Sequence, residues 1–120
     1  MSHIVQIATQ VRDVEAVKGA CKRMNLAPPV NGTHHLFEGP ATGWAVQLPN
    51  WSYPVVCDTG SGAVKYDNFG GRWGDKAQLD QFMQAYAAEK ATIEARRKGY
   101  RVAEQALPDG SIRLTIQAGV

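Results

Sequence analysis

The chain has 120 residues, of which 44% are hydrophobic and 20% are charged, and its formal net charge is +2. This length suits one domain, residues 1–120, that buries a core without disulfides or metals, and the near-neutral charge argues against a protein built mainly to bind nucleic acid or a membrane surface. No apolar run approaches the roughly 20 residues of a membrane-spanning helix and the first residues lack a signal-peptide pattern, so we expect a cytoplasmic protein.

The first half of the chain predicts one strand, one short helix and then several short strands. Hydrophobic residues alternate over residues 2–11, which is typical of a strand with one face on a core. Over residues 14–24 apolar side chains recur every three or four positions, as in an amphipathic helix, and Asp13 is placed to cap its start. Further strands are expected at residues 33–38, 43–48, 54–57 and 63–66. The glycine-rich turn between the last two indicates a hairpin.

The strongest signal is a long amphipathic helix over residues 76–98. Asp75 and Gln78 have the spacing of a capping box, in which two side chains satisfy backbone N–H groups at the helix start. Gly99 supplies the left-handed residue that commonly ends a helix. We therefore expect this helix to be well defined at both ends.

A last hairpin pairs residues 101–106 with 111–117 around Pro108-Asp109-Gly110, giving the order β-α-β-β-β-β-α-β-β. Strands that follow one another directly pair antiparallel, and two helices can cover only one face of such a sheet. The sequence thus predicts an α+β fold of two layers, with a mainly antiparallel sheet and one short and one long helix. An edge strand in so small a sheet invites a homodimer.

Segments near both ends of the chain resemble a known family. They are Met-Ser-His at 1–3, Thr-Gln-Val-Arg-Asp at 9–13, Gln-Ala-Tyr-Ala at 84–87 and Asp-Gly-Ser-Ile-Arg-Leu at 109–114. This pattern resembles a conserved family of unknown function, typified by hypothetical open-reading-frame proteins of plastids and cyanobacteria, while residues 28–64 depart from it. The family offers no activity or catalytic residue to transfer. Its genomic association with AAA-type ATPases and small iron–sulfur proteins implies a role in an assembly or maintenance complex.

The loop of residues 66–75 is the first candidate site. Its glycines let the backbone approach a ligand, and the start of the following helix is positive, so an anion could bind there beside Arg72, between Tyr66 and Trp73. The alternative is a tight connection in which Trp73 packs on the core and Asp75 caps the helix. The spacing matches neither a P-loop nor a dinucleotide fingerprint. We favour the connection, because glycine-rich turns routinely serve geometry alone.

The centre of the chain carries many aromatic residues for a small protein. Trp51 and Tyr53 lie in a proline-flanked segment, where large rings are hard to bury. Aromatic side chains on loops are typical anchors of protein interfaces. We therefore expect Trp51, Tyr53 and Trp73 to bind a protein partner, with Arg72 at the rim. This favours a non-enzymatic interaction or adaptor domain, or a subunit of a larger complex, and the resemblance points to an ATPase-containing assembly as the partner.

A small enzyme or ligand-binding protein that uses the loop of residues 66–75 is the alternative. Cys57, beside a turn, is the better candidate for a reactive thiol, since Cys21 lies on the apolar stripe of the first helix. It would need His34 or His35 as a partner. These two adjacent histidines point to opposite sides of a strand, and nothing in the spacing joins either to His3 in a metal site. The sequence predicts no catalytic residue, metal or cofactor.

Four cations, Arg96, Arg97, Lys98 and Arg101, gather at the end of the long helix. With Tyr100 for base stacking they would make a weak nucleic-acid binder. The same cations complement the negative end of the helix dipole and need no partner for that. Four charges on a near-neutral chain give weak, salt-sensitive binding at most, so we favour the second interpretation.

Overall fold

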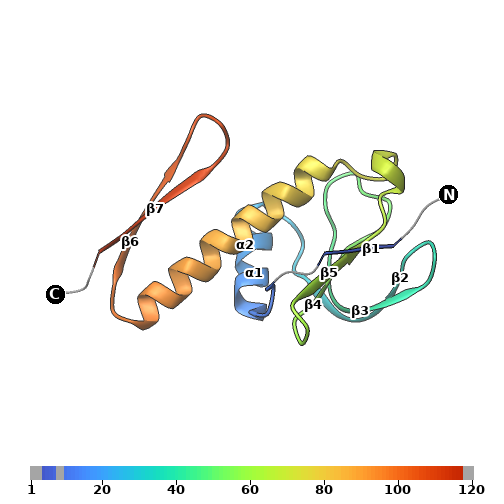
Figure 1. The fold of residues 1–120 in the computed structure, drawn as a ribbon, viewed down its shortest axis with the longest axis horizontal. Coiled ribbons are helices and arrows are strands. Elements are labelled where there is room, and N and C mark those ends of the chain that lie inside the picture. Colours follow the sequence, from blue (N-terminus) through green and yellow to red (C-terminus); the bar gives the residue numbers. More distant parts are fainter. Residues whose placement is uncertain (1–3, 8–9, 118–120) are drawn as a thin grey trace.

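The computed structural model describes residues 4–7 and 10–117, with β1 described by its backbone alone. Figure 1 shows the elements in chain order: β1 (Val5–Ile7), α1 (Val14–Arg23), β2 (Val30–His35), β3 (Pro40–Val46), β4 (Val55–Asp58), β5 (Ala63–Tyr66), a 3₁₀ turn η1 (Phe69–Gly71), α2 (Lys76–Arg97), β6 (Arg101–Ala106) and β7 (Ile112–Gln117). The predicted α+β class and the order β-α-β-β-β-β-α-β-β are confirmed. No helix in the described ranges has both the length and the apolar character needed to cross a membrane.

Five of the strands form one antiparallel sheet with the order β1-β5-β4-β3-β2. Across its centre Cys57 on β4 lies opposite Trp44 on β3 and Val64 on β5. Because paired residues share a face, this register sends Val46, Val55 and Val64 to one side of the sheet together. The strands expected at residues 33–38 and 43–48 both begin earlier, since β2 and β3 pair with each other across the turn that starts at Leu36.

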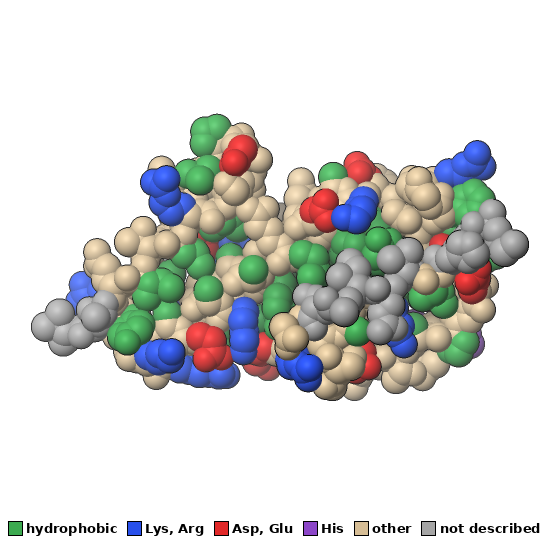
Figure 2. Space-filling view, in the orientation of Figure 1, with side chains coloured by type: hydrophobic (Ala, Val, Ile, Leu, Met, Phe, Trp, Pro, Cys, Tyr) green, Lys and Arg blue, Asp and Glu red, His purple; other side chains and the backbone are tan. Residues whose placement is uncertain are grey.

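β6 and β7 form a two-stranded sheet of their own and do not join the other five strands. In Figure 1 this hairpin starts near the C-terminal end of α2 and rises away from the helix, with its turn at the top of the view, and Figure 2 shows it as a lobe separated from the rest by a notch. The Cα radius of gyration is 15.1 Å, against about 14 Å for a compact chain of this length. The projecting hairpin therefore makes the molecule longer than a simple globule.

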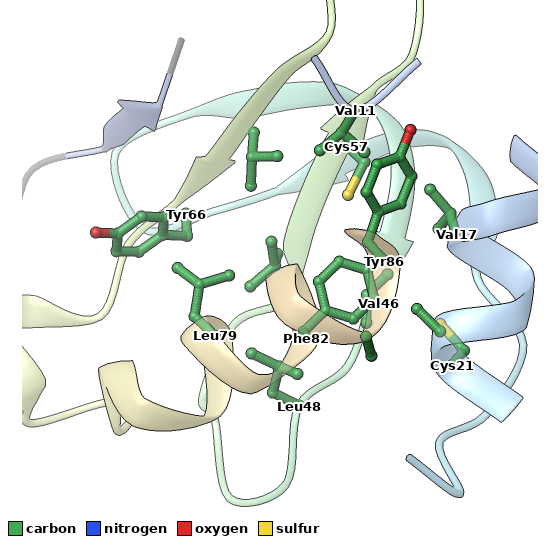
Figure 3. Close-up of a cluster of buried hydrophobic side chains, with 14 of the residues drawn as sticks. Val11, Val17, Cys21, Val46, Leu48, Cys57, Tyr66, Leu79, Phe82 and Tyr86 are labelled. Atoms are coloured by element: carbon green, nitrogen blue, oxygen red, sulfur yellow. The ribbon is translucent and has the colours of Figure 1, made fainter. Parts of the chain in front are cut away.

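The main core lies between one face of the five-stranded sheet and the two helices (Figure 3). α1 contributes Val17 and Cys21, and α2 contributes Leu79, Phe82 and Tyr86, all of which are buried. The opposite face of the sheet carries a smaller buried cluster, made by Leu36, Ala41, Ala45 and Val56. Both helices thus cover the same face, as the two-layer prediction requires.

The helix ends follow from their capping residues. Asp13 accepts hydrogen bonds from the N–H groups at the start of α1, and Asp75 accepts one from Ala77 at the start of α2. Gly99 has φ +80° and lets Tyr100 N–H bond Ala95 C=O at 2.9 Å, which ends α2. The predicted capping box is only half right. The Oε1 atom of Gln78 is buried without a hydrogen-bond partner in the described part of the chain, so it does not return a bond to the cap.

Candidate functional site

Four aromatic side chains meet at the surface, on loops at the end of the sheet away from the hairpin. Trp73 lies at their centre, with ring centroids 5.1 Å from Phe37, 5.4 Å from Tyr53 and 4.7 Å from Phe69, on which it stacks. Phe37 and Tyr53 also approach edge to face at 6.5 Å. The guanidinium of Arg72 lies 5.3 Å from the centroid of Phe69. We call these five residues the aromatic cluster.

Three separate loops supply the aromatic cluster, and backbone hydrogen bonds join two of them. Phe37 lies in the turn between β2 and β3, Tyr53 precedes β4, and Phe69 begins η1. Ser52 N–H donates to Trp73 C=O at 2.8 Å, which fixes the second loop against the third. The cluster is therefore built by the tertiary fold, from segments that are distant in the sequence.

Backbone contacts also hold the third loop in place. Trp73 N–H bonds Asn68 C=O at 2.9 Å, and the Asn68 side-chain amide donates to Gly74 C=O at 3.3 Å. Asp67 is fully buried, and one of its carboxylate oxygens accepts from Phe69 N–H at 3.3 Å. These bonds fix the third loop, and with it the rings of Phe69 and Trp73, in place.

The aromatic cluster remains open to solvent. Phe37 is 59% exposed, and Tyr53, Phe69 and Trp73 are each half-buried. Ring pairs in such arrangements contribute about 0.5–1.5 kcal/mol each beyond their burial, which helps the cluster hold its shape. Tyr53 also packs against the small buried cluster on the face of the sheet that the helices leave uncovered. The exposed rings thus rest on a buried apolar base.

Two predicted binding residues, Trp51 and Tyr66, belong to the core instead. Each is only 5% exposed, and their rings meet edge to face at 5.8 Å. Trp51 Nε1 donates to Asp75 C=O at 3.3 Å, beneath the start of α2. Trp51 therefore does not face a partner as expected, because the segment before β4 folds under α2 and carries Trp51 inward while Tyr53 stays outside. Tyr66 likewise does not line the ligand site expected in the loop of residues 66–75.

The predicted reactive thiol is also wrong. Cys57 is fully buried, and it faces the helices from β4 (Figure 3). Desolvation by burial, with a smaller contribution from Cys21, raises the pKa of Cys57 to about 12. A thiol with that pKa and no exposure is not a nucleophile at neutral pH.

The remaining candidate residues stay apart. His34 Nε2 lies 2.9 Å from Val30 C=O, and His34 and His35 are successive residues of β2, on opposite faces. His3 lies outside the described residues. In the described ranges, no group of three or more His, Cys, Asp or Glu side chains is placed to hold a metal ion.

The loop of residues 66–75 behaves mainly as a connection. The Asp75 carboxylate takes the position at the α2 N-terminus that an anion would occupy. Gly74 gives Trp51 room, since a Cβ atom there would collide with the indole. Of the ligand-site residues proposed for this loop, Arg72 and Trp73 lie together in the aromatic cluster and Tyr66 does not.

The basic residues are exposed as expected, at the other end of the molecule. Arg96, Arg97 and Lys98 end α2, Arg101 begins β6, and Figure 2 shows Lys and Arg side chains gathered at this end. Arg97 donates to Glu94 Oε1 at 3.3 Å, and Lys90 donates to the same oxygen at 2.9 Å. Part of the positive charge is therefore neutralised locally.

Sequence reasoning missed Phe37 and Phe69 as members of the site. Phe37 lies in a short Leu-Phe-Glu-Gly turn between β2 and β3, and Phe69 lies in the glycine-rich loop beside Arg72. The rule that singled out Trp51, an aromatic ring on a loop, would have found Phe69, whereas Phe37 fell within the strand expected at residues 33–38. Comparisons of the chain with models of protein families, with curated proteins and with solved structures each gave no match.

Proposed function

We propose that this protein is a non-enzymatic interaction domain that binds a protein partner through the aromatic cluster. The observation that carries the proposal is the meeting of four partly exposed rings from three loops, with an arginine at their edge. Aromatic residues and arginine are the types enriched at the centres of protein interfaces. The proposed role is that of an adaptor, or of a subunit in a larger complex.

The geometry favours binding because the side chains of the aromatic cluster need little further ordering when a partner binds. Immobilising a flexible side chain at an interface costs about 0.5–1.5 kcal/mol, and rings that already pack on one another avoid much of that cost. Phe37 is the most exposed of the rings and would become buried first. Trp73 touches the other three rings, so replacing it would disturb the packing of the whole cluster.

The alternatives gain less support from the same structure. Cys57, the group that would have supplied covalent chemistry, is buried with a raised pKa. At the basic end of α2 the ring available for base stacking is Tyr100, and Arg97 there is paired with Glu94, whereas the aromatic cluster lies at the opposite end of the molecule (Figure 1). Neither an enzyme nor a nucleic-acid binder is therefore our preferred function.

Affinity capture from cells that naturally make the protein tests the proposal. The wild-type chain should retain a stoichiometric protein partner, and Phe37→Ala or Trp73→Ala should weaken that complex roughly 30-fold, the effect of losing about 2 kcal/mol at an interface hot spot. Tyr100→Ala is the matched control, because Tyr100 is an exposed ring outside the cluster. Circular dichroism and thermal unfolding should confirm that each variant folds.

Two results would overturn the proposal. One is the absence of any stoichiometric partner of the wild-type chain. The other is a partner that folded Phe37→Ala and Trp73→Ala proteins retain as well as Tyr100→Ala does.

A further inference from the structure

The C-terminal hairpin has an open edge along β7. In the part of the chain that the structure describes, β6 and β7 pair with each other and with no third strand. An isolated two-stranded sheet is marginally stable in water, and an unpaired edge is a template for another strand. Such an edge is usually blocked by charge or proline, whereas the only charged residue of β7 is Arg113.

The turn of the hairpin determines which backbone groups lie on that edge. Gly110 N–H donates to Leu107 C=O at 3.0 Å, and Leu107 N–H donates to Ser111 C=O at 2.9 Å. Bonding alternates along an antiparallel ladder, so Arg113 and Thr115 bond back to β6. The N–H and C=O groups of the next residues, Ile112, Leu114 and Ile116, therefore project from the free edge.

We propose that a second copy of this chain pairs with β7, antiparallel and about a two-fold axis at Leu114. In this register Leu114 lies opposite Leu114 of the second copy, and Ile112 lies opposite Ile116. Each of these residues offers outward N–H and C=O groups, so the pairs are hydrogen-bonded in both directions. Arg113 lies opposite Thr115, so no like charges oppose each other.

Symmetry leaves few other registers. Residues that lie directly opposite each other in a sheet are on the same face. Another two-fold register is therefore possible only if it keeps the apolar residues of both copies on one face of the sheet. A shift towards the turn places Arg113 against Arg113, which is unfavourable. A shift away from the turn places Ile112 opposite a position beyond the described end of β7 in the second copy. The β6 edge is less suitable, because Glu104 at its middle is engaged by Arg23.

The apolar face of β7 remains partly exposed in the single chain. Ile116 is 47% exposed and lines a groove between the hairpin and α2 with Ala91, Ala95 and Tyr100, while Glu94 and Lys98 complete the lining. Pairing two hairpins would make a four-stranded sheet with one α2 helix from each copy on its apolar face, a standard two-layer arrangement. This dimer uses the end of the molecule opposite the aromatic cluster and stands independently of the proposed function.

Sedimentation of the full chain over a range of concentrations tests the pairing. The wild type should show a monomer–dimer equilibrium. Leu114→Pro should abolish the dimer, because proline removes an outward N–H while leaving the bonds between β6 and β7 in place. Unchanged circular dichroism and unchanged amide protection at Arg113 and Thr115 would confirm that the hairpin of this variant is intact.

Charge changes at Thr115 test the register. Thr115→Glu sets a carboxylate opposite Arg113 of the second copy and should tighten the dimer, whereas Thr115→Arg should weaken it. The two symmetric pairs together predict changes of roughly 2- to 30-fold in the dissociation constant. Combining Thr115→Arg with Arg113→Glu should restore dimerisation.

Cross-linking gives an independent readout. The Cα atoms of a hydrogen-bonded antiparallel pair lie about 5.5 Å apart, within disulfide range, so Leu114→Cys should form a covalent dimer on mild oxidation. Gln105→Cys, on the far strand of the hairpin, should not. A wild-type chain that stays monomeric throughout would overturn the proposal, as would a dimer that Leu114→Pro and the Thr115 changes leave unaltered.

Discussion

Lys90 on α2 holds the carboxylate of Asp13, the N-cap of α1, with 3.2 Å between Nζ and Oδ2. The other oxygen of Asp13 accepts hydrogen bonds from Glu15 N–H at 2.9 Å and Ala16 N–H at 3.3 Å. Tyr86, also on α2, accepts a bond from Asp13 N–H at 3.1 Å. One residue therefore both starts α1 and fixes that start against the middle of α2.

Replacing Asp13 should destabilise the protein in a pH-dependent way. Asp13→Ala should lower the free energy of unfolding by about 1 kcal/mol at pH 7, the usual value of a lost N-cap. Chemical denaturation measures this directly. Glu15→Ala is the control, since Glu15 is exposed and its nearest ion pair, with Lys18, spans 3.8 Å.

The sign of the pH dependence follows from the pKa of Asp13. Partial burial opposes ionisation, but the hydrogen bonds from Lys90, Ala16 and Glu15 hold this pKa below its ordinary value of 3.8. The stabilisation is therefore complete above pH 3.8 and is lost as the pH falls through the lower, folded-state pKa. The difference in the free energy of unfolding between wild type and Asp13→Ala should therefore shrink over that range. A difference that grows in acid would contradict this account.

Gly74 should tolerate no side chain. A Cβ atom there would collide with the indole of Trp51, which is fixed in the core. Gly74→Ala should therefore cost roughly 1–3 kcal/mol of stability, as overpacking does. Gly39→Ala is the matched control, because a Cβ there meets nothing within 4 Å. Equal melting temperatures of the two variants would show that Trp51 can move aside.

Cys57 should be inert in the folded protein. In a Cys21→Ala background it is the only thiol, since the chain has 2 cysteines. With its pKa raised by burial to about 12, the thiol stays protonated at pH 8, and it is out of solvent. A thiol reagent should label it no faster than the protein unfolds, and at once in denaturant. Rapid labelling of the native protein would refute its burial.

Arg23 should control how firmly the hairpin is held. It pairs with Glu89 on α2 at 2.9 Å and with Glu104 on β6, so it joins the hairpin to both helices. Arg23→Ala should speed hydrogen exchange of β6 and β7 amides about fivefold, for a loss of roughly 1 kcal/mol. Lys76→Ala, which breaks the exposed pair with Asp80, should leave that exchange unchanged.

The sequence predicted the two helices well because their ends depend on local chemistry. Asp13, Asp75 and Gly99 act within a few residues of themselves, and each is placed by the structure as expected. The five-stranded sheet and the separate hairpin could not be told apart in this way. The alternation of Ile112, Leu114 and Ile116 is the same whichever strand lies beside them.

The site was harder to predict, because burial of a loop residue depends on distant segments. Trp51 and Tyr53 are two positions apart in the same proline-flanked segment, yet one is buried and the other joins the aromatic cluster. Room for Trp51 comes from Gly74, and the position of Tyr53 depends on Phe37 and Trp73. None of these contacts produces a recognisable pattern in the local sequence.

The three tryptophans have three different surroundings. Trp51 is buried in the core, Trp44 is half-buried with Lys18 Nζ 5.4 Å from its ring, and Trp73 lies in the aromatic cluster. Their emission is therefore expected to differ in colour and in access to a quencher such as acrylamide. With Trp44 and Trp51 replaced by phenylalanine, the intrinsic fluorescence of Trp73 would report occupancy of the cluster without any added label.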